Sequence, residues 1–115
     1  MSVLDKETVD GIALDRDGNG IRLLITDHLD WGNEHNHLFI LQEKINSYIA
    51  FCEGHQYDQV YKNAIVEYAI FEIHFMFEPT AKAMNFLEQV QRQVNEMGIA
   101  IECHVTEVKN NVIDK

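Results

Sequence analysis

The chain has 115 residues, 46% of them hydrophobic, with a single proline and six glycines. This composition excludes a disordered chain and predicts one globular domain over residues 1–115, with an ordered core from about residue 9 to residue 106 and short flexible termini. The formal charge of -10, from 19 acidic and 9 basic side chains, argues against a nucleic-acid partner, because binding to phosphates requires clustered lysine and arginine.

The N-terminus and the apolar segments predict a cytoplasmic protein that does not bind a membrane. The first residues lack the basic and apolar regions of a secretory signal, and no apolar run approaches the ~18 residues that a membrane span needs. The two cysteines, Cys52 and Cys103, are too few for a disulfide framework and fall at apolar positions, so we expect buried, reduced thiols. A single bridge between them stays open as an alternative.

Two short strands joined by a tight turn are expected at the start of the chain, at residues 9–14 and 21–26. The connection at residues 15–20 contains an Asp-Gly and an Asn-Gly dipeptide, which supply the positive φ angles that hairpin turns require. It also matches the first half of a calcium-binding EF-hand loop, but Thr26 stands where that loop needs a bidentate glutamate. The hairpin is therefore the preferred interpretation.

An amphipathic helix is expected from about residue 34, capped at its start by Asp30 or Asn33 and ended by Gly54. A polar connection at residues 55–63 follows it. Apolar side chains recur along the helix at steps of three and four, which is typical of a helix with one buried face. They are Leu38, Leu41, Ile45, Tyr48 and Cys52.

The second half of the chain predicts a strand, a helix and a final strand. Residues 65–77 are β-branched and aromatic, with apolar side chains of one parity facing inward. Pro79 is expected to start the second helix, where its missing N–H does no harm, and Gly98 is expected to end it. Residues 99–105 alternate as a strand with one face inward.

The resulting order ββαβαβ predicts an α/β (α+β) two-layer sandwich, in which a four-stranded mixed sheet carries both helices on one face. Right-handed crossovers from the second strand to the third, and from the third to the fourth, place both helices on the same side. The expected inward set is Ile21, Leu23, Ile25, Leu38, Leu41, Ile45, Phe71, Ile73, Phe75, Val90, Val94, Ile99 and Ile101.

The sheet face that the helices leave open is too apolar to be simply solvated. Val66, Tyr68, Ile70 and Met76 share this face on the third strand. Such a patch predicts contact with a partner, most simply a second copy in a symmetric homodimer. The candidate interface residues are Tyr68, Ile70, Glu72, His74, Met76, Glu102 and His104.

Two Glu-x-His pairs, Glu72 with His74 and Glu102 with His104, also fall on the open face. If their strands are adjacent and in register, two carboxylates and two imidazoles meet, with His28 as a further neighbour. Such a patch can bind a metal or transfer protons. The preferred interpretation is the solvated border of an interface, with opposite charges paired across the strands.

The densest polar chemistry lies at residues 27–37, which hold three of the six histidines and the only tryptophan. Imidazoles and carboxylates in one segment suit zinc or another first-row metal. However, the spacing of His35 and His37 places their rings about 200° apart on a regular helix, so the alternative is a polar capping loop with Trp31 as a lid. The candidate binding residues are Asp27, His28, Asp30, Trp31, His35 and His37.

Three segments are distinctive in combination: Thr26-Asp-His-Leu-Asp-Trp31, Leu41-Gln-Glu-Lys-Ile-Asn-Ser-Tyr-Ile-Ala-Phe51 and Phe77-Glu-Pro79. Through them the chain resembles, from residue 9 to about residue 105, a family of small uncharacterised bacterial proteins catalogued as a domain of unknown function. The resemblance implies a bacterial cytosolic single domain without a known activity, so it transfers no catalytic residue. It marks residues 27–31 and 42–44 as characteristic of such proteins.

Together these features predict a non-catalytic, small acidic cytosolic protein that binds a protein partner or itself through the open sheet face. Ser2 and Ser47 are the only serines, neither lies in a nucleophile motif, and the sequence contains no glycine-rich phosphate loop. No cofactor is expected under this interpretation. The alternative is a metal-binding protein or metal-dependent enzyme that holds a divalent ion in the cluster at residues 27–37.

Overall fold

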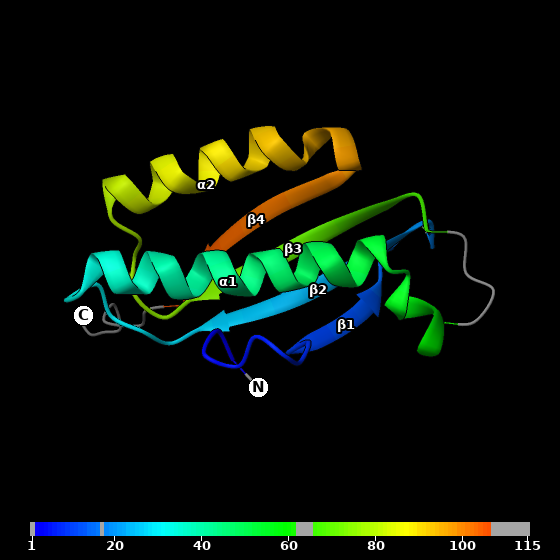
Figure 1. Ribbon diagram of the computed structural model, residues 1–115, viewed down its shortest axis with the longest axis horizontal. Helices are drawn as coiled ribbons and strands as arrows, with labels where there is room; N and C mark the ends of the chain where they lie inside the picture. The colour runs from blue at the N-terminus through cyan, green and yellow to red at the C-terminus, as the bar shows by residue number, and fades with distance from the viewer. Residues whose placement is uncertain (1, 17, 62–65, 107–115) are drawn as a thin grey trace, which may run out of the picture.

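The computed structural model describes residues 2–16, 18–61 and 66–106, which form one sheet and two helices (Figure 1). The elements are β1 (Gly11–Leu14), β2 (Gly20–Asp27), α1 (Glu34–Glu53), β3 (Tyr68–Phe75), α2 (Ala81–Val94) and β4 (Ile99–Val105), with short 3-10 turns at Gln56–Gln59 and Asn95–Met97. Their order is the predicted ββαβαβ. Neither helix in this part of the chain is long and apolar enough to cross a membrane.

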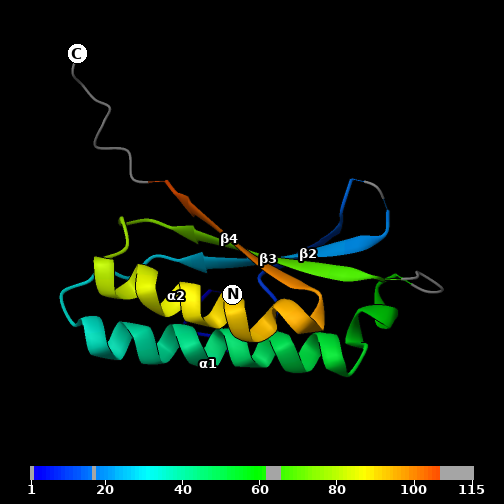
Figure 2. The same cartoon turned by 90° about the horizontal axis from the view of Figure 1, so that it is seen from above.

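The sheet is mixed, and its strands lie in the order β1-β2-β3-β4. β1 runs antiparallel to β2, whereas β2, β3 and β4 are parallel to one another. Each parallel connection contains a helix, and Figure 2 shows both helices on the same side of the sheet. The predicted two-layer architecture is confirmed, because successive right-handed crossovers in one direction along a sheet return to the same face.

The core lies between the helices and the covered face of the sheet, and its strand residues are largely those predicted. Three members of the expected inward set, Leu38, Val90 and Ile101, are only partly buried. In the first turn of α1, His37 takes the buried position in place of Leu38. Ile101 lies on the edge strand β4, which has a neighbouring strand on one side only. The fully enclosed apolar side chains include Ile21, Leu23, Ile25, Leu41, Phe71, Ile73 and Phe75.

Capping side chains define where the two helices begin. Asn33 caps α1, because its side-chain oxygen accepts a hydrogen bond from the backbone N–H of Asn36 at 3.2 Å. Thr80 caps α2 by accepting one from the backbone N–H of Ala83 at 3.1 Å. The expectation that Pro79 would begin this helix is therefore wrong by two positions, and Pro79 precedes the cap.

The turns also follow the sequence closely. The backbone N–H of Asp15 donates to the carbonyl of Gly20 at 2.7 Å, which closes the predicted hairpin, and Gly18 has the expected positive φ of 79°. Gly98 ends the turn after α2 with a φ of 75°. β3 spans Tyr68–Phe75 and is therefore shorter than the strand expected at residues 65–77. Residue 65 lies outside the described residues.

The N-terminal segment is part of the domain, although the sequence predicted a flexible tail. Val3 is buried, and its backbone N–H donates to the carbonyl of Thr26 at 2.9 Å. The ammonium group of Lys44 on α1 is fully buried and donates to the backbone carbonyls of Asp5 and, at 2.7 Å, Thr8. These contacts fasten residues 2–8 to the middle of α1 and to the end of β2.

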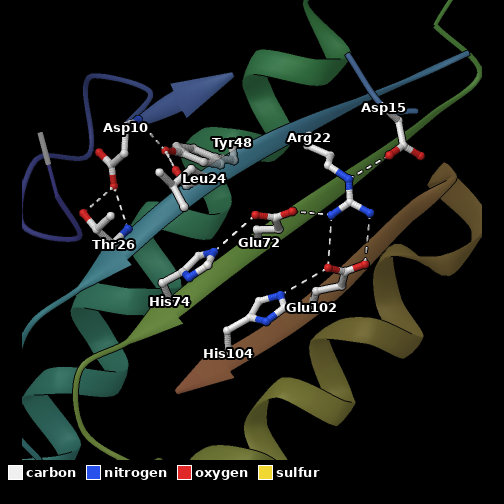
Figure 3. Close-up of polar contacts among 10 residues, drawn as sticks. All are labelled: Asp10, Asp15, Arg22, Leu24, Thr26, Tyr48, Glu72, His74, Glu102 and His104. Atoms are coloured by element: carbon white, nitrogen blue, oxygen red, sulfur yellow. Dashed lines mark hydrogen bonds and ion pairs between the residues drawn. The ribbon is translucent and has the colours of Figure 1, made fainter. Parts of the chain in front are cut away.

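The carboxylate of Asp10 joins this segment to both layers. It lies 2.9 Å from the Lys44 ammonium, and its other oxygen accepts from the backbone N–H of Thr26 at 2.9 Å. The Tyr48 hydroxyl accepts from the Asp10 backbone at 2.8 Å and donates to the Leu24 carbonyl at 2.6 Å (Figure 3). Burial raises the pKa of Tyr48, so the phenol stays protonated and keeps both contacts.

The two cysteines are free thiols, and they differ in exposure. Cys52 on α1 is half-buried, but Cys103 is exposed, so the expectation that both are buried is wrong for Cys103. Figure 2 shows the reason, because the C-terminal end of β4 twists away from the helix layer that covers its beginning.

We expect Lys44→Met to lower the free energy of unfolding by about 3 kcal/mol or more, because removing one partner of a buried ion pair leaves the other uncompensated. The matched control is Lys6→Met. Lys6 pairs with Glu43 at 3.0 Å on the exposed surface, where such pairs contribute about 1 kcal/mol at most. Urea unfolding measures both variants, and equal losses would show that Lys44 does not anchor the N-terminal segment.

We also expect the two thiols to react at different rates with an aromatic disulfide reagent. Burial, with a smaller contribution from Glu53, raises the pKa of Cys52 to about 11, so only about one thiol in a thousand is ionised at pH 8. The pKa of Cys103 is also raised by its surroundings, but its side chain is the more exposed of the two, so Cys103 is the accessible site. Cys103→Ala should therefore leave a slowly reacting thiol whose rate rises steeply with pH, and Cys52→Ala should keep the faster phase. The reverse assignment of the two phases would contradict the structure.

Candidate functional site

The open sheet face carries three rows of side chains, because residues in register on neighbouring strands point to the same side. The first row contains the only arginine of these strands, the second contains two glutamates and the third contains two histidines. In the order β2, β3, β4 the rows are Arg22, Ile70, Ala100; Leu24, Glu72, Glu102; and Thr26, His74, His104.

Arg22 organises this face by binding three carboxylates. Its Nε donates to Asp15 at 2.7 Å, and Nη1 donates to Glu72 and, at 3.1 Å, to Glu102. Figure 3 shows the guanidinium reaching from β2 across β3 toward β4. Ala100 is the β4 member of the row that contains Arg22. Its small side chain leaves room for the guanidinium to extend to Glu102.

The charges of the array are fixed by these contacts. Hydrogen bonds from the Tyr68 hydroxyl and from Arg22 lower the pKa of Asp15 to about 2. Arg22 lowers the pKa of Glu102 against the opposing effect of burial. For Glu72, burial raises the pKa, but hydrogen bonds from His74 and Arg22 outweigh it and the net shift is downward. Three ionised carboxylates around one guanidinium leave the array with a net charge of -2.

The two Glu-x-His pairs meet on adjacent strands in register, which confirms the condition stated from the sequence. His74 Nε2 lies 3.2 Å from Glu72, and His104 Nε2 lies 3.3 Å from Glu102. The two imidazole rings stack with centroids 4.7 Å apart and planes 16° apart. Glutamate faces glutamate and histidine faces histidine across the ladder, so the expected pairing of opposite charges across strands is made by Arg22 with Glu72 and Glu102 and not between the two Glu-x-His pairs. His28 is not a member of this group and lies beyond the end of β2.

Most side chains of the predicted apolar patch on this face are not freely exposed, because they pack against other parts of the chain. The Tyr68 ring lies over Gly20, where a Cβ atom would come within 2.3 Å of it, and its hydroxyl contacts Asp15. Ile70 is only 9% exposed, and in the register it stands between Arg22 and Ala100. Met76 is the one member of the patch that is freely exposed, at 47%. The open face therefore presents charge rather than apolar area.

A broad, open depression crosses the charged end of this face. The side chains that line it come from the β1–β2 hairpin, β3 and β4: Leu14, Asp15, Arg16, Arg22, Glu72, Glu102 and His104. Its floor is the arginine–carboxylate array, so a partner that enters it meets ionised oxygens held in fixed positions.

The loop at residues 27–37 has a different character, because its first and last residues are buried. Asp27 and His37 are 1% and 2% exposed, and their side chains are 2.6 Å apart. The other ring nitrogen of His37, Nδ1, lies 3.0 Å from the Asp30 carbonyl, which can only accept a hydrogen bond. Both ring nitrogens thus have hydrogen-bond partners within the chain.

Trp31 closes this buried pair from outside, as the lid interpretation predicted. Its ring stacks on His37 with centroids 3.6 Å apart, and its indole N–H donates to the Phe77 carbonyl at 3.2 Å. The remaining candidates of the loop, His28, Asp30 and His35, are exposed. The loop therefore brings Asp27, His37 and Trp31 together and leaves the other three candidates on the surface.

Asp15 and Arg22 are central to the array, but sequence reasoning gave them no functional role. Asp15 was considered only within residues 15–20, as part of a hairpin turn or of a partial EF-hand loop. The available signal was a single arginine on a face with two glutamates, since a lone guanidinium among carboxylates tends to bind several of them.

Comparison with known protein families now places the chain. It belongs to a family of unknown function, DUF6572, whose family model matches residues 1–107. The resemblance to a domain of unknown function is thereby confirmed. No curated protein and no solved structure gives a significant match.

We expect His37→Ala to lower the free energy of unfolding by about 3 kcal/mol, because the buried Asp27 carboxylate loses its histidine partner while keeping the Leu29 backbone N–H, and because the surface on which Trp31 stacks is removed. His35→Ala is the matched control on the same helix turn and should change stability by less than about 0.5 kcal/mol, since His35 is exposed. Thermal unfolding of the two variants decides the point. A small effect of His37→Ala would mean that the buried pair does not hold the loop.

Proposed function

We propose that the chain is a non-catalytic binding protein of the bacterial cytosol, whose open sheet face engages a basic segment of another protein. The observation that supports this proposal is the arginine-centred carboxylate array, which carries a net charge of -2 in a chain of formal charge -10. A cationic partner is drawn to such a surface, and fixed complementary charges select it over neutral or acidic competitors.

Preorganisation of the array favours binding. Asp15, Glu72 and Glu102 are already held by Arg22, so a partner does not need to order three flexible side chains on arrival. Such ordering otherwise costs about 0.5–1.5 kcal/mol for each side chain. The two free cysteines, Cys52 and Cys103, fit the reducing compartment that the proposal assumes.

The negative charge of the open face also favours a different protein as the binding partner over a second copy of this chain. A symmetric dimer through the open face would set each carboxylate array against its own image, because an isologous interface uses the same patch on both subunits. Like charges brought together across an interface cost several kcal/mol. With Ile70 covered, the apolar area that was expected to drive self-association is small. A basic segment meets neither obstacle.

The test compares two double variants that remove the same amount of charge. Glu72→Gln with Glu102→Gln alters the open face, and Glu88→Gln with Glu96→Gln alters exposed positions on and after α2. We expect the wild-type chain and the helix variant to retain a partner from cell lysate at low salt, and the open-face variant to lose it. Raising the salt to about 0.5 M should release the partner, because screening shortens the reach of surface charges.

Two outcomes would contradict the proposal. Equal capture by all variants would show that the open face is not the binding surface. Light scattering that finds a wild-type dimer, and a monomer for the open-face variant, would assign this face to self-association instead.

A further inference from the structure

His74 and His104 occupy matching positions on the parallel strands β3 and β4, and Glu72 precedes His74 by two residues on the same face. We infer that Glu72, His74 and His104 form a binding site for a first-row divalent metal ion of the Zn²⁺ class. This inference goes beyond the proposed function, because the site needs no protein partner.

The three side chains can surround one ion. One ligand atom from each of them lies within 4.8 Å of the other two. Ligands of a tetrahedral ion at about 2.1 Å lie roughly 3.4 Å apart, so each side chain has to move by only about an ångström. Their side chains are 24%, 33% and 46% exposed for Glu72, His74 and His104, and none of them is locked in a packed interior.

The donor atoms already point into a common space. Each histidine directs Nε2 back along its own strand toward the glutamate two residues earlier, at 3.2 Å for His74 and 3.3 Å for His104. Figure 3 shows the two imidazoles side by side with these nitrogens facing the glutamate row. The Nε2 atoms of both histidines and the near carboxylate oxygen of Glu72 therefore converge between the two rows, and a bound ion would replace the hydrogen that each Nε2 directs at its glutamate.

Arg22 holds the carboxylate ligand in position. It binds Oε2 of Glu72, and the other oxygen, Oε1, is the one that faces His74. A metal-binding carboxylate is commonly oriented by a hydrogen bond to its second oxygen in this way. Arg22 thus fixes one ligand without occupying the oxygen that the ion would take.

The charge of the array favours a dication. Arg22 bridges the glutamate row, in which Glu72 and Glu102 lie directly opposite each other, and it leaves a net charge of -2. A divalent ion beside the histidine row would neutralise this remainder. Two nitrogen ligands with one oxygen select zinc and its first-row neighbours, whereas magnesium and calcium prefer oxygen alone. Three protein ligands would leave a further coordination position for water or for a side chain of a partner.

The experiment titrates Zn²⁺ into purified chain without an affinity tag, after treatment with a chelator, in competition with a chromogenic chelator at neutral pH. We expect one ion per chain. His74→Ala and His104→Ala should each weaken binding by about 100-fold or more, and Glu72→Gln by about tenfold, because even outer groups around a metal contribute 10–100-fold. Excess Mg²⁺ should not displace the Zn²⁺.

His35→Ala and His28→Ala are the matched controls, since both remove an exposed histidine outside the site. They should change the affinity by less than about twofold, within the error of additivity for distant sites. Circular dichroism checks that each variant is folded, and His104→Gln keeps the side-chain size while removing the ligand nitrogen.

Three results would overturn the site: no Zn²⁺ binding at micromolar concentration, binding that survives in His74→Ala and His104→Ala, or an equal loss in the controls. Because the titration contains no partner, failure here leaves the charge-based proposal standing. Conversely, loss of partner capture in the glutamate variants without any metal effect would support only that proposal.

Discussion

Two parallel crossovers that return to the same side of a four-stranded sheet constrain everything else in this fold. They place α1 and α2 on one face and leave the other face without a second layer. Side chains of the sheet itself must then cover that face. The long side chain of Arg22 does this by crossing β3 to β4, and Tyr68 does it by lying flat on Gly20. The open face becomes polar because its apolar members are covered from within the sheet.

The covered face shows the opposite arrangement, in which charge is buried to join segments. Two of the five buried residues of α1 are the polar His37 and Lys44. Each reaches a part of the chain that has no strand or helix of its own, the loop after β2 and the N-terminal segment. A fully apolar helix face would pack on the sheet equally well, but it could not satisfy the backbone carbonyls that Lys44 binds. Buried polar groups therefore determine where the loops lie.

Periodicity and turn chemistry were enough to predict the layers, the element order and the residues of β2 and β3 that face the core. They failed at positions of α1 where the buried side chain is polar and not apolar. In the first turn of α1, the sequence allows either Leu38 or His37 to face the core together with Leu41. The contact with the buried Asp27 favours His37. Lys44 was noted only as part of the characteristic segment 42–44, and its burial was not predicted. Similarly, the alternation along β3 placed Ile70 on the open face correctly, but it did not predict that Ile70 is only 9% exposed there.

Stability alone gives a poor explanation of the charged array. Exposed ion pairs contribute about 0–1 kcal/mol each, and two glutamates placed directly opposite one another on neighbouring strands repel. Threonine or valine at these positions would suit a sheet surface better. Instead Glu72 faces Glu102, His74 faces His104, and one arginine restrains the carboxylates. An arrangement of like residues in register is costly in isolation, and the cation that we propose to bind between them would offset this cost.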